Sequence, residues 1–216
     1  MSINQHDRVF GMIPNKSIGM LDAWDKNAFA ELSISEIMEH TGKKTKPWVF
    51  NVLKALAKYN LLVKKRKGNI NLYTLSLDNP LLVQTLQFLE IQNNYNFTKL
   101  DVIKEIISKT PPSAYCLLVF GSYAEGKQTK ESDLDVCFLI ESAAAEKKIK
   151  SYFNEIKLAT HVNIDEHYIT FSDFIKMLLR DEENLAKQIF RNRRIFFGAD
   201  IYYKLIMEAH KNGFRP

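Results

Sequence analysis

The stretch of sequence that decides the fold reads Val119-Phe120-Gly121-Ser122, then nine residues, then Ser132-Asp133-Leu134-Asp135-Val136-Cys137-Phe138-Leu139-Ile140. The first part ends an apolar, β-prone run that begins at Ala114, and the second part opens another such run. Both runs are bounded by small and polar residues, which predicts two buried strands. Successive side chains of a strand point to opposite faces, so we expect Asp133 and Asp135 to project from the same face. Two carboxylates placed in this way could share one or two hard divalent cations.

The overall composition predicts a folded protein of two small domains. Of the 216 residues, 46% are hydrophobic and 25% are charged, a balance typical of globular proteins. The longest stretch without a charged residue contains Pro111, Pro112 and Gly121, which favours a loop and a buried strand over a membrane span. The segment from Met1 to Arg8 has no basic stretch followed by an apolar one, so we expect no signal peptide and a cytoplasmic protein.

The two cysteines, Cys116 and Cys137, have neither the spacing of a zinc site nor the density of a disulfide framework. Both fall within the apolar, strand-like runs. We therefore expect buried, reduced thiols in preference to a disulfide bond or a catalytic thiol.

The net charge of +5 belongs to the first part of the chain. Residues 1–78 carry 12 basic and 7 acidic side chains, whereas residues 79–216 carry 18 of each, so the excess is +5 in the first segment and 0 in the second. Between Lys43 and Lys67 there are nine basic residues and no acidic one. Such a cluster favours an anionic partner over an ordinary solvated surface.

The same basic segment predicts two helices followed by a hairpin. Ser33 and Glu36 have the spacing of a capping box, which predicts a helix start, and Gly42 predicts the end of that helix. A second helix is expected from about Thr45, with Pro47 tolerated in its first turn. Two β-prone runs around a Lys-Gly-Asn turn then predict a hairpin over residues 61–75 with a cationic tip.

Residues 15–78 resemble a winged helix-turn-helix domain, a family that lays its second helix in the DNA major groove and its hairpin wing along the neighbouring backbone. The resemblance implies phosphate contacts at the helix entrance and in the wing, from Lys43, Lys44, Lys46, Lys65, Arg66 and Lys67. It also implies contacts to base edges from Asn51 and Lys54. A homodimer is expected, because helix-turn-helix proteins often meet paired half-sites. The alternative is that the domain serves only dimerisation or partner contact, with its lysines solvated.

The second half of the chain predicts an α/β (α+β) domain with a mixed sheet flanked by helices. Residues 1–78 would form the first domain, 79–96 a connecting helix and 97–216 the second domain, whose first helix is expected over 97–108. Gly121-Ser122, ten further residues and Asp133-x-Asp135 resemble the signature of the minimal nucleotidyltransferases, relatives of DNA polymerase beta and kanamycin nucleotidyltransferase. The resemblance extends from about residue 97 to residue 210.

Each signature residue suits the chemistry that the resemblance implies. Gly121 and Ser122 would approach phosphate, and Asp133 and Asp135 would hold Mg²⁺, with Mn²⁺ as an alternative, against the triphosphate of ATP or another nucleotide. The family commonly adds a third carboxylate from a later strand, for which Asp165 is the candidate, as metal ligand or as base. Strand alternation places His167 on the same face as Asp165, where a structural role is favoured over a role in the site, and it places Glu166 on the opposite face.

The chain departs from the family pattern at Glu125, where relatives often carry an arginine. Lys127, the candidate nucleotide-binding cation, or Lys130 could compensate for this anion; the alternatives are that the nucleotide binds differently or that the activity is weak. A further basic run, Arg191-Asn192-Arg193-Arg194, is interpreted as a solvated turn between helices in preference to a nucleotide- or RNA-binding segment.

The resemblance implies a Mg²⁺-dependent transfer of a nucleoside monophosphate, AMP from ATP, to a hydroxyl group. In related operons the minimal nucleotidyltransferase acts as an antitoxin that adenylylates a tyrosine of a partner toxin, often an RNase of the HEPN class. Two alternatives remain open: a transcriptional regulator whose second domain only senses a nucleotide, and a small-molecule transferase of the aminoglycoside-modifying type.

Overall fold

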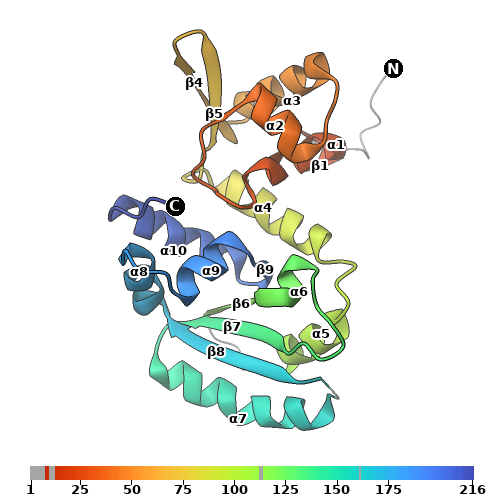
Figure 1. Cartoon of the computed structure of the whole chain (residues 1–216), viewed down its shortest axis with the longest axis vertical. Helices are drawn as coiled ribbons and strands as arrows, with labels where there is room; N and C mark the ends of the chain where they lie inside the picture. Colours follow the sequence, from red (N-terminus) through yellow and green to blue (C-terminus); the bar gives the residue numbers. More distant parts are fainter. Residues whose placement is uncertain (1–7, 10–12, 112–113, 161) are drawn as a thin grey trace. The chain divides into compact units, whose positions relative to one another are not determined.

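A computed structural model describes residues 8–9, 13–111, 114–160 and 162–216 (Figure 1). The chain separates into two compact units, and the division falls between Leu89 and Glu90. This point lies inside helix α4 (Pro80–Asn93), the segment predicted to connect the domains. Among the described residues, the helices lack the combination of length and apolar character that crossing a bilayer requires.

The first unit contains short strands and helices followed by a hairpin. In chain order they are β1 (Arg8–Val9), β2 (Ile13–Pro14), α1 (Asn15–Ile18), the 3₁₀ helix η2 (Gly19–Trp24), β3 (Leu32–Ser33), α2 (Ile34–Thr41), α3 (Lys46–Lys58), β4 (Leu62–Lys67) and β5 (Ile70–Leu75). The predicted capping box is confirmed, because the Ser33 hydroxyl accepts from the Glu36 amide while the Ser33 amide donates to the Glu36 carboxylate at 2.7 Å. Gly42 ends α2 in the left-handed conformation, with φ of 64°.

Helix α3 buries one side and exposes the other. Its buried stripe is Val49, Val52, Leu53 and Leu56. The predicted hairpin is present as β4 and β5, and β3 completes a three-stranded sheet in the order β3-β5-β4. All eight residues predicted to contact DNA are exposed: Lys43, Lys44, Lys46, Asn51, Lys54, Lys65, Arg66 and Lys67. The order of elements is the one expected for a winged helix, and DNA binding by this unit stays a prediction.

The second unit contains a four-stranded sheet and six helices in the described part of the chain. The elements after α4 are α5 (Leu100–Lys109), β6 (Tyr115–Val119), α6 (Gly121–Glu125), β7 (Leu134–Ile140), α7 (Ala143–Ala159), β8 (Ile164–Thr170), α8 (Phe171–Leu179), α9 (Leu185–Arg191), β9 (Arg194–Phe197) and α10 (Ala199–Lys211). Helix α5 begins three residues after the predicted start at Phe97. Phe97 instead packs its ring against Phe196, with centroids 4.9 Å apart.

The sheet of the second unit has the order β8-β7-β6-β9. Strands β7 and β8 are parallel, whereas β6 pairs antiparallel with β7 and with β9, so the expected mixed sheet is confirmed. Strand β9 was not predicted, because its four residues begin inside the basic run and look from sequence like a link between helices. Parallel strands need a crossover connection, and α7 supplies it between β7 and β8.

Helices cover both faces of this sheet. On one face Leu134, Val136 and Phe138 of β7 pack in a core with residues of α5 and α7. On the other face α8 contacts β7 and β8, and α10 contacts β6. Figure 1 shows α7 below β8, with α8, α9 and α10 gathered on the opposite side of the strands. Cys116 and Cys137 are buried free thiols, as predicted, and burial raises the pKa of both.

Candidate functional site

Two carboxylates lie side by side at the beginning of the parallel strands. Asp135 on β7 is in register with Asp165 on β8, and neighbours in register point to the same face of a sheet. One ligand atom each from Asp135, Asp165 and His167 can be chosen so that all three lie within 4.8 Å of one another. The His167 Nε2 and Asp165 Oδ2 atoms are 3.1 Å apart. The structure thus places Asp165 beside Asp135 and adds an imidazole to the pair.

The predicted turn is packed directly against Asp135. Gly121 has φ of 65°, and a Cβ atom at this position would lie 2.1 Å from Asp135 Oδ2, much closer than atoms can approach. The Phe120 amide also donates to the Asp135 carbonyl at 3.1 Å. Only glycine combines this backbone conformation with so close an approach. The glycine of the signature therefore fixes the position of the turn relative to the carboxylate.

Asp135 lies in an environment that disfavours its charged form, and a bound cation would offset this effect. Burial raises the pKa of its carboxyl, and the neighbouring charges of Asp165 and Asp133 raise it further, against an opposing effect of His167. Two carboxylates and an imidazole form a donor set that divalent cations accept. The residues present therefore fit a divalent metal ion.

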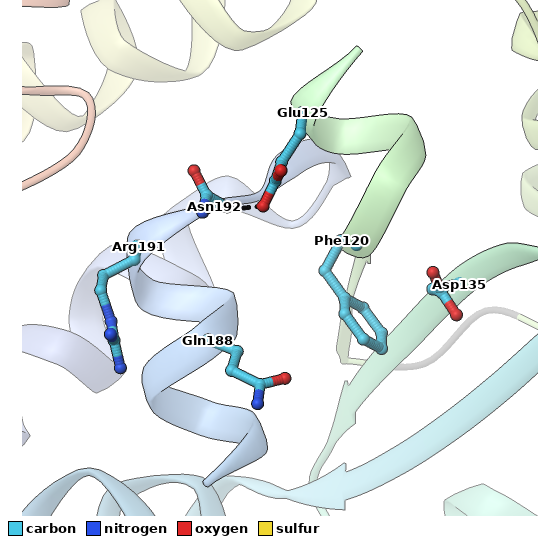
Figure 2. Close-up of a pocket in the computed structure, with 7 residues that line it drawn as sticks. Phe120, Glu125, Asp135, Gln188, Arg191 and Asn192 are labelled. Carbon is cyan, nitrogen blue, oxygen red and sulfur yellow. Dashed lines mark hydrogen bonds between the residues drawn. The ribbon is translucent and has the colours of Figure 1, made fainter. Parts of the chain in front are cut away.

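A pocket of about 360 Å³ opens beside this turn. It is lined by Phe120, Gly121, Glu125, Asp135, Gln188, Arg191 and Asn192. Figure 2 shows Phe120 and Asp135 on one side and the side chains of α9 and the residue after it on the other. Glu125 accepts a hydrogen bond from Asn192 Nδ2 at 3.2 Å, drawn as a dashed line in Figure 2. Its second oxygen lies 2.8 Å from Lys127 Nζ.

The sequence-predicted site residues fall into two groups in space. Gly121, Asp135 and Asp165 are brought together. Asp133 is exposed, precedes β7 and lies outside the close group of ligand atoms, although its charge reaches Asp135.

Two further residues were predicted to bind nucleotide, Ser122 and Lys127, and neither lines the pocket. The Lys127 ammonium is paired with Glu125, which raises its pKa. Lys127 therefore balances the unusual anion directly. The assignment of these residues to nucleotide binding stays a prediction.

Sequence reasoning missed the polar residues that form the far wall of the pocket. Gln188, Arg191 and Asn192 are spaced by three and four positions, so they share one face of α9 and its end. That spacing is the signal that could have grouped them. The Arg191 guanidinium pairs with the Glu183 carboxylate.

The prediction of a solvated basic turn is wrong for Arg193. Its side chain is 3% exposed, lies 4.0 Å from the Glu90 carboxylate and stacks over the Tyr202 ring. The neighbouring Arg194 donates to the Ala124 carbonyl in α6 at 3.3 Å. These two arginines therefore hold the sheet, α4 and α6 of the second unit together. The sequence alone does not distinguish a buried, paired arginine from an exposed one.

Glu166 points away from the site, as predicted. Its carboxylate pairs with Lys157 on α7, the helix that covers the opposite face of the sheet. His167 alternates back to the side of Asp165, and its ring meets Phe120 edge to face, with centroids 5.3 Å apart.

A mixed sheet that places two carboxylates side by side, one of them against a glycine turn, is a geometry suited to metal-dependent chemistry on phosphates. Residues 101–202, from α5 to the start of α10, match the family model described as polymerase beta, nucleotidyltransferase. This part of the chain is therefore similar to the nucleotidyltransferases of the polymerase beta type.

The chain also has a resemblance to a solved structure described as "Crystal structure of the toxin-antitoxin with AMP-PNP". The identity is 16% and the TM-score is 0.34, and the match covers 52% of this chain and 87% of the other. No curated protein matches the chain.

Proposed function

We propose that this protein transfers a nucleoside monophosphate, AMP from ATP, to a hydroxyl group and releases pyrophosphate. The observation that carries the proposal is the pair Asp135 and Asp165, held side by side on neighbouring strands, with Asp135 packed against Gly121 and lining the pocket. The family match over residues 101–202 supports the same class of reaction.

The divalent cation would be held by Asp135 and Asp165, with Asp133 as a further predicted ligand. When bound, such a cation neutralises triphosphate charge that would otherwise repel the attacking oxygen. Mg²⁺ is the ion that the family resemblance implies. Gly121 keeps the turn packed against Asp135, and Ser122 with the amides that follow it is the predicted donor set for a phosphate.

In the proposed step the acceptor oxygen forms a bond to the α-phosphorus, and the bond from that phosphorus to pyrophosphate breaks. The acceptor proton passes to Asp165, whose side chain is 59% exposed and can therefore meet a second substrate. A carboxylate has two oxygens, so one can face the cation while the other takes the proton.

The acceptor is proposed to be a hydroxyl of a partner protein, such as a toxin, which the family resemblance suggests.

The test uses ATP labelled at the α-phosphate, the full chain, Mg²⁺ and either a protein extract or a panel of aminoglycosides. We expect label on protein, with at least a hundredfold loss in Asp135→Asn and Asp165→Asn. Glu166→Gln is the matched control, because this acid lies on the same strand and points to the other face. Label on an aminoglycoside would show that the acceptor is a small molecule and not a protein. The absence of any nucleotide binding would contradict the proposal.

A second candidate function is nucleotide sensing without turnover. The observation that favours it is Glu125, an anion on the wall of the pocket, held there by Asn192 and Lys127. A carboxylate in this position opposes a triphosphate and could weaken catalysis. Nucleotide binding with no label transfer to any acceptor would favour sensing.

We also propose that the first unit binds DNA through its basic face, as a homodimer on paired half-sites. The support is the nine basic residues between Lys43 and Lys67 and the exposure of every predicted contact residue. DNA binding would suit a protein that regulates its own promoter, whichever function the second unit has.

A further inference from the structure

We propose that His167 is a protein ligand in the cation site, and that its nitrogen makes the site prefer a first-row transition ion over Mg²⁺. This inference rests on the proposed function, because it concerns the cation that Asp135 and Asp165 would hold. It adds a residue outside the Gly-Ser and Asp-x-Asp signature, and it changes the chemical class of the ion.

The first argument is the separation of the donor atoms. Ligands bound at about 2.1–2.2 Å and at right angles to each other lie about 3.0–3.1 Å apart. The His167 Nε2 and Asp165 Oδ2 atoms are 3.1 Å apart, and an Asp135 oxygen lies within 4.8 Å of both. A single ion could therefore replace the proton between His167 and Asp165, and Asp135 is near enough to join it with a small side-chain movement.

The second argument is the way in which the imidazole is held. Asp165 and His167 are two positions apart on β8, so both project from the face that carries Asp135. The Phe120 ring contacts the imidazole edge to face at an interplanar angle of 64°. The His167 side chain remains 34% exposed, which leaves its nitrogen accessible to an ion from solvent. Phe120 immediately precedes Gly121, so the same turn positions both Asp135 and His167.

The third argument is ligand chemistry. Mg²⁺ takes oxygen ligands in a strict octahedron and keeps several waters, whereas imidazole nitrogen is a common ligand of first-row transition ions. A site made of two carboxylates and one imidazole gains affinity for the transition ions relative to an all-oxygen site. Asp133, which the structure leaves outside the close group, is then not needed as the third ligand.

The experiment measures Mn²⁺ bound to the full chain in the presence of inorganic triphosphate, which supplies phosphate oxygens without any nitrogen. Pulsed electron paramagnetic resonance detects a ¹⁴N nucleus that is bonded directly to Mn²⁺. We expect this coupling in the wild type, its change to a ¹⁵N pattern after ¹⁵N-histidine labelling, and its loss in His167→Gln. The ratio of Mn²⁺ to Mg²⁺ affinity, from calorimetry, should fall at least about tenfold in the same variant. His40→Gln is the control, because His40 is exposed on α2 in the other unit.

Two results would overturn the inference, and they are distinguishable. If Mn²⁺ binds in a manner that requires Asp135 and Asp165 but shows no nitrogen coupling, His167 is not a ligand and the proposed function stands. If neither Mn²⁺ nor Mg²⁺ binds, the cation site of the proposed function fails as well. The labelling experiment uses the wild-type protein, so it shows whether a histidine is bonded to the ion even if His167→Gln does not fold. His167 is the histidine that the described residues place beside Asp135 and Asp165.

Discussion

At the scale of single residues, the site depends on the absence of a side chain at Gly121. Gly121 is the first residue of α6 and Gly126 follows its last residue, and both have the left-handed conformation, with φ of 65° and 70°. A Cβ at Gly126 would meet nothing within 4 Å, whereas one at Gly121 would collide with the Asp135 carboxylate. A comparison of substitutions at the two positions therefore separates the effect of backbone strain from the effect of the close approach to Asp135.

We expect Gly121→Ala and Gly126→Ala each to cost about 1–2 kcal/mol of strain, since an L residue must enter the left-handed region. Gly121→Ala must also displace Asp135, so only this variant should lose Mn²⁺ binding and label transfer by tenfold or more. Denaturant unfolding and calorimetry with Mn²⁺ measure the two effects. Equal metal affinity in the two variants would contradict the role assigned to Gly121.

Asp135 should make the metal-free protein less stable as the pH rises. The folded-state pKa of its carboxyl is raised above the usual 3.8, so between these two values the folded protein binds more protons than the unfolded chain. Stability from this group is therefore complete at low pH and is lost as the pH rises through the raised pKa. Asp135→Asn, which carries no proton-dependent charge, should show a smaller loss. Thermal melting at a series of pH values above 3.8 measures the difference.

Asp135→Asn also tests whether a bound ion stabilises the folded protein. A ligand that binds only the folded state stabilises it by about 2.7 kcal/mol at a hundred times its Kd. Mn²⁺ should therefore raise the melting temperature of the wild type and have little effect on Asp135→Asn. An equal rise in both proteins would place the ion elsewhere.

At the scale of elements, the helices and strands that depend on neighbouring residues were predicted, whereas one strand that depends on a distant partner was not. The capping box at Ser33 and the left-handed Gly42 define α2 through contacts that span at most four positions, so the sequence contains the whole argument. The hairpin of β4 and β5 and the strands β6, β7 and β8 follow from periodicity in the same way. Strand β9 has four residues and exists because it pairs with β6 far away in sequence, which no local pattern reports.

The candidate site was predictable in the same uneven way. The spacing of Gly121, Asp133 and Asp135 predicted a turn against a carboxylate, and strand alternation predicted the directions of Asp165, Glu166 and His167. Amphipathicity indicates which face of α9 is buried, but it does not indicate that Gln188 and Asn192 border a turn more than sixty residues away. For the same reason the burial of Arg193 beside Glu90 required the tertiary structure.

The hairpin wing gives a prediction that concerns one element. Replacing Lys65, Arg66 and Lys67 by alanine removes three cations from the tip of β4, where all three are exposed. If they contact phosphates, the dependence of log affinity on log salt should become shallower by up to about 2.7 for each bound protomer, or 0.9 per contact. Lys65 pairs with Glu31 at 3.1 Å, so its share should be the smallest. Fluorescence anisotropy on duplex DNA at several salt concentrations measures the slope, and an unchanged slope would remove the wing from the DNA interface.

At the scale of the whole molecule, charge and chemistry belong to different parts of the chain. The net excess of +5 lies within residues 1–78, whereas every residue that lines the pocket belongs to the second unit. A non-hydrolysable ATP analogue with Mn²⁺ should therefore slow hydrogen exchange at β7, β8 and α9. A DNA duplex should slow exchange at α3 and β4. Mass spectrometry of exchange in the full chain distinguishes the two patterns, and protection of α3 by the nucleotide would contradict this assignment.

Because β7 pairs with β8, Asp135 and Asp165 can become neighbours only after β8 has been synthesised. Asp135 and Asp165 are separated by thirty positions, with all of α7 between them. On the ribosome, a nascent chain therefore exposes Asp135 well before the partner strand has been synthesised. A truncated translation product that stops after Asp135 and before β8 carries the complete Gly-Ser and Asp-x-Asp signature and still lacks the Asp165 side of the ion site. Premature termination should thus yield inert fragments, and a scan for the signature alone would count them as intact.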